Sequence, residues 1–412
     1  MMFFALLLAT ATLFSPERTG VTMAGRREAV WYKHDGLVSS RGPVDRFSVV
    51  KPVVERHEKV PLLVVLHWRG AGLPGKGVEM QTRVSDSKDA VFSAPDDFYI
   101  LNLDDIRNYN RWLGRTHEDY WWGATSAYDG PVEDDVPRLF LKSTVCEERI
   151  LATVEWVIQN YPIDRDRIYL CGNSMGGQAA MAIGLAHGDI FAAVNANVPA
   201  TPWYAVARLA LDRDDVARFP DPPVYIEWSG VDDDWSRDRD RAISPVRRRK
   251  WPHIILWGDF GHCGSIVEAR KKNDLIERFD WLTIRRNEAY PVFTSASCDD
   301  VLPWPKLTVA SGQINAFFRW RNIVDGEGSF AMELYIASPD ELGTTQFEVP
   351  EAAIVDVSLR RIQSADIANS TSLRWKFGGM QGVIRRKLGD LITIENLPIT
   401  RDRQILVVEP ET

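Results

Sequence analysis

The segment from residue 168 to residue 177 carries the clearest chemical signal in the sequence. Residues 168–171 form an apolar run typical of a buried strand, which leads into Gly172-Asn173-Ser174-Met175-Gly176-Gly177. An Ala- and Gly-rich stretch over 175–187 then predicts a tightly packed helix. A Gly-x-Ser-x-Gly pattern between a strand and a helix forces the serine onto a strained turn that exposes its hydroxyl. The pattern therefore predicts that Ser174 is a nucleophile.

A serine hydroxyl needs a base to take its proton, and that base needs an orienting acid. After this kind of turn the chain order is serine, acid, histidine, which leaves His253 and His262 as candidates for the base. His253 opens an apolar strand pattern and is expected to be packed in the core. His262 lies in the glycine-rich loop 258–264 just beyond that strand. Because glycines let the loop reach back over the serine, we predict that His262 is the base.

The acid is expected in the loop that follows the apolar run 224–228. Asp232, Asp233 and Asp234 stand there in succession. A spacing of three residues after Gly230 favours Asp233 as the acid. The other two are expected to be solvated or to cap the next turn, although all three compete for the role.

Acyl transfer also requires N–H donors for the oxyanion that forms on the substrate. One expected donor is the backbone N–H of Met175, directly after the nucleophile. The second is expected from Trp68 or Arg69, because the loop 67–72 after the run 62–66 is rich in glycine and lets the backbone approach a ligand. His67 is interpreted as a structural brace for this loop.

Aromatic residues near the expected catalytic edge are candidates for the walls of a substrate pocket. The pattern places Trp121 and Trp122 after the run 99–103, Trp203 after the run 192–196, and Trp235 in the loop that holds the acid. Tryptophan offers a flat apolar surface for stacking, yet it packs equally well in cores. Both roles stay open for each of these residues.

The sequence pattern around these residues predicts a parallel sheet with crossover helices, which would position them. Short apolar or β-branched runs alternate with longer helical patterns, as α/β proteins require. Residues 144–160 predict a helix with Ile150, Val154, Val157 and Ile158 on one face and acidic residues in its first turn. The expected fold class is an α/β-hydrolase fold, a mostly parallel sheet with helices on both faces. The expected core strands are 62–66, 99–103, 168–171, 192–196, 224–228 and 253–257.

The pattern changes near residue 291 to short alternating strands separated by turns, which predicts a C-terminal all-β sandwich. This part contains no histidine and no Gly-x-Ser-x-Gly motif, so we assign it no chemistry of its own. Its aromatic residues are expected to pack inside the sandwich or against the hydrolase part rather than to bind a polymer. They are Trp304, Phe317, Phe318, Trp320, Trp375 and Phe377. The expected strands are 312–320, 329–337, 353–361, 372–377, 391–397 and 404–408.

Length and charge narrow the class of protein further. A chain of 412 residues favours two domains. We place them at 25–288 (catalytic) and 289–412 (β-sandwich), after an expected signal or N-terminal segment at 1–24. The formal net charge of −8 argues against nucleic acid as a partner. The apolar run that begins at Met1 suits the core of a signal peptide and is too short for a membrane span, so a secreted or periplasmic location and no membrane partner are expected.

The four cysteines form no Cys-x-x-Cys pair, so a zinc ribbon is not expected and no metal or cofactor is predicted. Cys171 and Cys263 lie close in sequence to the proposed nucleophile and base. A disulfide between them and two buried thiols are both open interpretations.

The segment 155–164, which ends in Tyr161-Pro162-Ile163-Asp164, together with residues 167–177, resembles a broad group of esterases. The group comprises polyhydroxybutyrate-depolymerase-like, feruloyl and acetylxylan esterases, with the prolyl oligopeptidase catalytic domain as a cousin. The resemblance covers residues 61–281 and implies a triad of Ser174, Asp233 and His262. His67-Trp68 departs from the usual His-Gly pair at the oxyanion loop.

The resemblance implies a serine esterase that acts on small or polymeric esters, among them feruloyl and acetyl groups linked to polysaccharides. Two alternatives remain. One is a serine peptidase similar to prolyl oligopeptidase, although no N-terminal propeller is seen. The other is a non-catalytic binding protein with a relic hydrolase domain.

Overall fold

The structure is a computed structural model, and the residues that it describes fall into the following ranges: 14–34, 45–54, 58–68, 91–104, 107–110, 115–118, 121, 143–200, 202–213, 219–235, 238–262, 278–305, 310–343 and 347–411. The expected core of the signal peptide, residues 1–13, lies outside these ranges, so export stays a prediction. Arg69, Trp122 and Cys263 also lie outside them.

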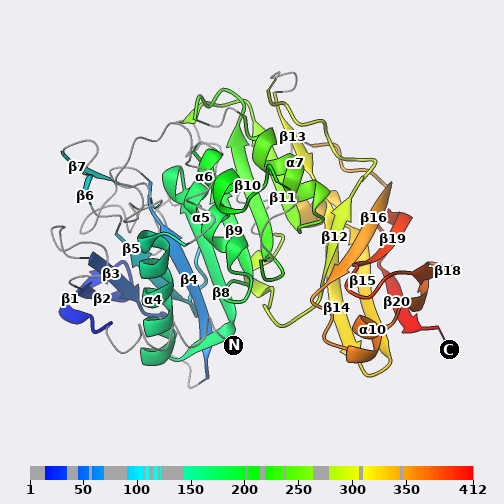
Figure 1. Cartoon of the computed structure of the whole chain (residues 1–412), viewed down its shortest axis with the longest axis horizontal. Helices are drawn as coiled ribbons and strands as arrows, with labels where there is room; N and C mark the ends of the chain where they lie inside the picture. The colour runs from blue at the N-terminus through cyan, green and yellow to red at the C-terminus, as the bar shows by residue number, and fades with distance from the viewer. Residues whose placement is uncertain are drawn as a thin grey trace.

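A ten-stranded mixed sheet forms the centre of the described part of the chain, in the order β1-β2-β3-β5-β4-β8-β9-β10-β11-β13. The strands from β5 to β11 pair in parallel, while β1, β2 and β3 continue the sheet antiparallel at one edge. Figure 1 shows β1–β3 at one end of the molecule and the C-terminal strands at the other. The strands are β1 (Glu17–Ala24), β2 (Arg27–His34), β3 (Asp45–Val50), β4 (Val60–Leu66), β5 (Tyr99–Leu103), β8 (Ile163–Asn173), β9 (Ala193–Asn197), β10 (Val224–Gly230), β11 (His253–Gly258) and β13 (Gly312–Ile314). A separate pair is formed by β6 (Arg107–Asn110) and β7 (Arg115–Glu118).

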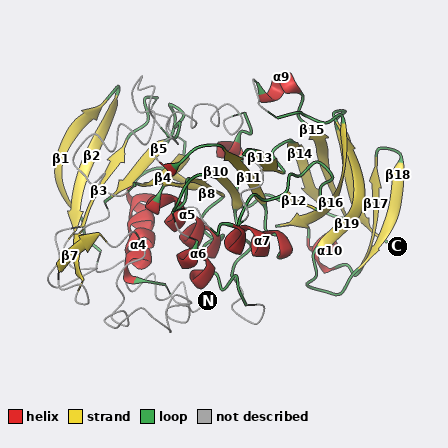
Figure 2. Ribbon diagram, turned by 90° about the horizontal axis from the view of Figure 1, so that it is seen from above, coloured by secondary structure: helices red, strands yellow, loops and turns green. Residues whose placement is uncertain are grey.

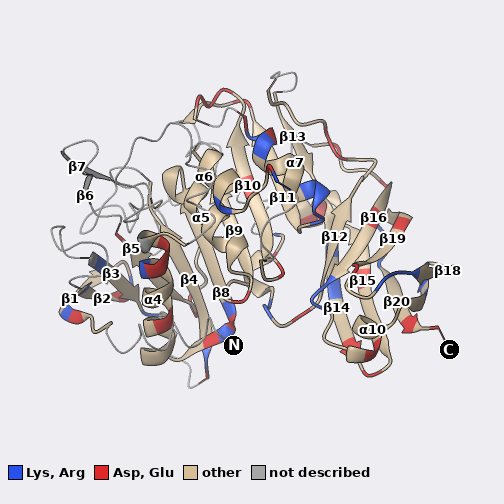
Figure 3. Ribbon diagram, in the orientation of Figure 1, with Lys and Arg blue, Asp and Glu red and all other residues tan. Residues whose placement is uncertain are grey.

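This sheet contains all six predicted core strands and gives the predicted α/β-hydrolase architecture. Because successive side chains of a strand point to opposite faces, Leu62, Val64 and Leu66 of β4 join one buried cluster. Leu63 and Val65 join another on the opposite face. Strands buried on both faces need near-continuous apolar sequence, and β9 and β11 carry no charged residue (Figure 3).

The N-terminal boundary differs from the prediction. Residues 17–24, assigned from sequence to a separate N-terminal segment, form β1 and pair along β2. Phe14 is buried and stacks on His34 at the end of β2, with ring centroids 4.4 Å apart. An apolar count cannot distinguish such an edge strand from the end of a leader segment.

Four helices pack on one face of the sheet, as Figure 2 shows, and each contributes buried apolar side chains to the same cluster. They are α4 (Val145–Asn160), α5 (Met175–Ala186), α6 (Trp203–Arg208) and α7 (Asp240–Arg248). Helices were predicted on both faces of the sheet, and these four helices lie on one of the two faces. Within the described residues the other face is covered by side chains such as Phe98 and Trp281, and by part of the C-terminal region.

Helix α4 shows how local sequence sets its position. Thr144 caps the helix by accepting a hydrogen bond from the N–H of Glu147 at 3.1 Å, and the predicted apolar face packs on the sheet. Glu147 is fully buried rather than solvated. Burial acts to raise its pKa, but hydrogen bonds from Arg208 (2.7 Å) and His187 (2.6 Å) outweigh this and lower the pKa to about 2. The carboxylate therefore ties α4 to α5 and α6 as a charged group.

The C-terminal region is built of two antiparallel sheets, β12-β16-β19 and β14-β15-β20-β17-β18. Their inward side chains share one buried cluster with the face of the central sheet that lacks the helices. The stretch 312–320, predicted as one strand, is split: β13 pairs with β11 in the central sheet, and β14 enters the five-stranded sheet. The elements are β12 (Tyr290–Thr294), β14 (Phe318–Gly326), β15 (Ser329–Ile336), β16 (Ala352–Arg360), β17 (Ser372–Phe377), β18 (Met380–Arg385), β19 (Ile392–Thr400), β20 (Gln404–Pro410), the 3-10 helix η2 (Trp281–Thr283), and the short helices α9 (Pro339–Leu342) and α10 (Ala365–Asn369).

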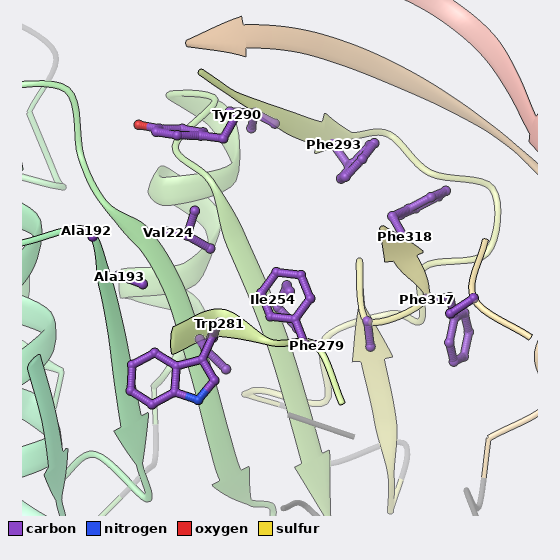
Figure 4. Packing of buried hydrophobic residues seen from close by; sticks show 14 of the residues in the cluster. Ala192, Ala193, Val224, Ile254, Phe279, Trp281, Tyr290, Phe293, Phe317 and Phe318 are labelled. Atoms are coloured by element: carbon purple, nitrogen blue, oxygen red, sulfur yellow. The ribbon is translucent and has the colours of Figure 1, made fainter. Parts of the chain in front are cut away.

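Aromatic and arginine side chains of the C-terminal region lie at its boundary with the central sheet. Phe293 of β12 and Phe318 of β14, both in the C-terminal region, stack with ring centroids 4.6 Å apart (Figure 4) and line a small cavity together with His253 and Ile254 of β11. Arg360 donates to the carbonyl of Lys250 at 2.8 Å, and Arg361 donates to that of Gly188 at 2.7 Å. The six aromatic residues singled out from the C-terminal sequence are buried or half-buried, which agrees with packing rather than with an exposed row. Within the described residues, no helix is both long and apolar enough to cross a bilayer.

Candidate active site

Ser174 sits on a strained turn between β8 and α5. Its φ of 58° and ψ of −117° lie in a region that few residues other than glycine adopt. A Cβ built on Gly172 would lie 2.0 Å from the carbonyl oxygen of Gly176, and one built on Gly176 would lie 2.2 Å from that of Leu66. Both glycines of the motif are therefore required for the turn to close against its own backbone and against β4.

The turn is held by hydrogen bonds to the neighbouring strand. The N–H of Ser174 donates to the carbonyl of Asn197 at 2.9 Å, and the N–H of Ala200 donates to the carbonyl of Ser174 at 3.0 Å. The side-chain amide of Asn197 donates to that of Asn173 at 2.7 Å, and both residues are buried. Sequence reasoning missed Asn197, although its place at the end of β9, beside the end of β8, is the signal that could have found it.

Ser174, His262 and Asp233 form a continuous hydrogen-bonded chain. The Oγ of Ser174 lies 2.7 Å from Nε2 of His262, and Nδ1 of His262 lies 2.7 Å from Oδ2 of Asp233. Because a carboxylate accepts, Nδ1–H donates to Asp233, and Nε2 is left to take the serine proton. The structure thus brings together the three residues that the sequence predicts for a triad.

The three neighbouring aspartates have different environments. Asp233 is 1% exposed, and its second oxygen accepts from the N–H of Trp235 at 2.8 Å. Asp232 and Asp234 are exposed. Asp233 is buried and hydrogen-bonded to His262, so the geometry favours it among the candidates that the sequence left open.

A buried ion pair closes the loop that carries Asp233. Glu227 on β10 accepts from Nε of Arg239 at 2.8 Å, and neither side chain is exposed. Burial acts to lower the pKa of Arg239, but the adjacent carboxylate raises it above its ordinary value, so the guanidinium stays charged. Because Glu227 precedes the loop and Arg239 follows it, their contact fixes both ends of the segment.

The start of α5 supplies one predicted oxyanion donor. Met175 is the first helical residue, so its N–H has no partner four residues earlier. The N–H of Ser174 is already donated to Asn197 and cannot serve. Within the described part of the loop after β4, Trp68 is half-buried and His67 is buried. Arg69, the other predicted donor, lies outside the described residues.

The four tryptophans that were candidates for substrate contact differ in exposure and position. Trp235 is 43% exposed, and its ring centroid lies 6.1 Å from that of His262. Trp203, at the start of α6, is half-buried. Trp121 does not fit the prediction: it is 0% exposed, because it packs against His67 behind the loop that follows β4. Trp122 lies outside the described residues.

Other predicted features are only partly visible. His253 is buried, as expected for a packed residue. Cys171 is buried on β8, while Cys263 is not described, so the disulfide stays untested. In the described ranges, no group of three or more His, Cys, Asp or Glu side chains is arranged to hold a metal ion.

The sequence profile of the prolyl oligopeptidase family (Peptidase S9) matches residues 141–230, a segment that spans α4, the serine turn and β10. Curated proteins yield no match. This match supports a serine hydrolase of the α/β-hydrolase fold.

Several solved structures are similar to this chain. An S-formylglutathione hydrolase from Agrobacterium tumefaciens is 16% identical, with a TM-score of 0.43, over 65% of this chain and 98% of that one. A thermostable esterase is 15% identical, with a TM-score of 0.40, over 66% of this chain and 63% of that one. An acylaminoacyl peptidase from Pyrococcus horikoshii is 16% identical, with a TM-score of 0.37, over 66% of this chain and 42% of that one.

Proposed function

We propose that this serine hydrolase cleaves carboxylic esters through Ser174, His262 and Asp233. The observation that carries the proposal is the pair of 2.7 Å contacts that join the serine hydroxyl to the imidazole and the imidazole to a buried carboxylate. A serine at a strained strand-to-helix turn gains nucleophilicity only when such a base is aligned with it.

The chemistry follows from the donors and acceptors. Ser174 Oγ attacks the ester carbonyl while Nε2 of His262 takes the hydroxyl proton. Asp233 stabilises the imidazolium through Nδ1–H. The N–H of Met175, with a second donor from the loop after β4, binds the oxyanion. His262 then gives its proton to the leaving alcohol, and an acyl-enzyme forms on Ser174. Water, deprotonated by His262, releases the acid and restores the serine.

We propose that substrate choice depends on exposed aromatic surface, above all that of Trp235. Trp235 exposes a flat apolar surface beside His262, and Trp203 lies half-buried at the start of α6. These surfaces suit stacking on a planar or sugar-linked group. They support feruloyl or acetyl esters of polysaccharides, or other small and polymeric esters, as the substrate class.

The test is Ser174→Ala with p-nitrophenyl acetate, methyl ferulate and acetylated xylan as substrates. We expect hydrolysis of every substrate that the native enzyme cleaves to fall to background. Circular dichroism and the melting temperature should remain near native values. A Ser174→Ala protein with undiminished activity would falsify the proposal.

A serine peptidase is the second candidate, because the matching family profile is that of prolyl oligopeptidases. The same three side chains can cleave amides, so the geometry alone does not separate the two activities. The discriminating measurement compares kcat/KM for p-nitrophenyl acetate with that for a proline-containing peptide anilide and for an N-acylated one. A ratio that favours either anilide over the ester would reverse the preference.

A further inference from the structure

Trp121 combines two unusual features behind the active site. Its φ is 64°, a left-handed conformation that is strained for a bulky side chain. It is also among the largest fully buried side chains in the described residues. A strained residue persists only where its surroundings hold it, and such residues gather at functional sites.

The indole of Trp121 holds the backbone of the loop that follows β4. Its Nε1–H donates to the carbonyl of His67 at 3.0 Å. The next carbonyl, that of Trp68, accepts from Nδ1 of His67 at 2.7 Å. Two successive carbonyls of this loop are therefore fixed by buried donors. Because the peptide unit is planar, holding the His67 carbonyl also fixes the direction of the Trp68 N–H.

Charged side chains hold the two rings in place. The imidazole of His67 meets the indole edge-on, with centroids 4.9 Å apart. Its Nε2 lies 3.5 Å from the carboxylate of Asp104, just after β5, and Asp104 also pairs with Arg46 at 2.9 Å. The guanidinium of Arg149 on α4 lies 5.7 Å from the indole centroid and donates to the carbonyl of Asp104 at 2.9 Å.

This arrangement lies directly against the nucleophile helix. A Cβ on Gly176, two residues after Ser174, would meet the carbonyl oxygen of His67 at 2.7 Å. The His67 carbonyl that Trp121 holds therefore lies against the first turn of α5, whose first residue is Met175. A shift of this carbonyl would change the position of the loop relative to the start of α5.

We propose that Trp121 is a positioning residue that sets the backbone of the oxyanion loop after β4 and does not contact substrate. This inference rests on the proposed function, because it assigns Trp121 a part in stabilising the oxyanion of that reaction. The left-handed φ of Trp121 and its full burial are consistent with this role, because its indole N–H donates to the buried backbone at His67.

The direct test is Trp121→Phe, which keeps a large ring and removes the N–H. Loss of a complete oxyanion donor costs about 10²–10³-fold in kcat, so a misdirected loop should lower kcat by about tenfold. KM for p-nitrophenyl acetate should stay within about twofold. The inhibition constant of a trifluoromethyl ketone, whose adduct carries an oxyanion, should rise by the same factor as kcat falls. If Trp121 had a purely structural role, the variant would have a lower folded fraction, and its inhibition constant would not rise in proportion to the fall in kcat.

Trp257→Phe is the matched control. Trp257 is equally buried, but its Nε1–H has no hydrogen-bond partner among the described residues. Its kcat and ketone affinity should remain native. The inference is overturned if Trp121→Phe keeps native kcat, if Trp257→Phe loses as much, or if ketone affinity is unchanged while kcat falls.

A second pair of variants covers the case in which Trp121→Phe does not fold. His67→Ala removes the donor to Trp68, whereas the amide of His67→Asn can still reach that carbonyl. We expect a kcat loss in the first and partial recovery in the second; equal losses overturn the inference. Failure of the proposed function would appear differently, as a native enzyme without ester hydrolysis or a Ser174→Ala variant with full activity.

Discussion

One histidine, His253, begins β11, and a second, His262, follows shortly after its carboxyl end. The surroundings of these two histidines differ in kind. At the amino end, His253 is 4% exposed. Its Nδ1 donates to the carbonyl of Trp251 at 2.8 Å, and its Nε2 faces the amide of Asn315 at 3.2 Å. At the carboxyl end, the side chain of His262 is 23% exposed and lies between a carboxylate and a hydroxyl.

The difference teaches that partners, rather than residue type, decide what a histidine can do. His253 has neutral partners, and burial lowers its pKa to about 4, so it remains neutral and structural. The amide of Asn315 also donates to the carbonyls of His253 and Phe293 and therefore cannot turn to accept a proton. His262 instead has a carboxylate that stabilises its charged form and a hydroxyl that supplies a proton.

The largest expected effect comes from His262→Ala. In comparable triads, loss of the base costs on the order of 10⁶-fold in kcat, and we expect a loss of that size here, measured with p-nitrophenyl acetate. Stability should change little or increase, because active-site groups are seldom optimised for stability. The matched variant His253→Ala should show the reverse, native kcat per folded molecule and a lower melting temperature. If both variants lost activity equally, the distinction between a catalytic His262 and a structural His253 would be wrong.

The next effect concerns the carboxylate that distinguishes His262. Asp233→Asn preserves shape but removes the charge that selects the imidazole tautomer, which costs about 10⁴-fold in kcat in a comparable triad. Asp232→Asn and Asp234→Asn, both at exposed positions, should retain native kcat within about threefold, because surface changes of this kind have small effects. A larger loss in either control than in Asp233→Asn would assign the acid elsewhere.

Local patterns allowed much of the fold and of the chemistry to be predicted. The apolar runs predicted β4, β5, β8, β9, β10 and β11, because strands buried on both faces must be apolar. The serine turn, its base and its acid follow from a fixed chain order and short spacings, and the structure places them in contact.

What sequence reasoning missed depends on long-range contacts. No local sequence feature indicates that Gly312–Ile314 pairs with β11 rather than with the C-terminal sheets, because the sequence of a short strand does not specify its partner strand. Trp121 was a candidate for a pocket wall because it follows β5 in sequence, with a core position left open, and its burial depends on His67 and Arg149, which come from distant elements. Burial of an aromatic side chain cannot be inferred from its type alone.

The smallest of the three effects is the pH dependence of stability that His253 should impose. Its pKa is about 4 in the folded protein against an ordinary value of 6.5, so the unfolded chain takes up a proton that the folded one refuses. The contribution of His253 to stability is therefore lost as pH falls from about 6.5 to about 4, by about 3 kcal/mol in total. Nearby Asp299 has the opposite tendency, because burial raises its pKa to about 6 while Arg247 pairs with it at 3.1 Å. The native curve alone would mix the two groups, so the measurement compares it with that of His253→Phe, in which Asp299 is retained. Unfolding free energies from urea titrations at pH 7, 6, 5 and 4 should show the native protein losing about 3 kcal/mol relative to the variant. A difference that stays constant across this range would mean that burial does not lower the pKa of His253 in the folded protein, and the prediction would be wrong.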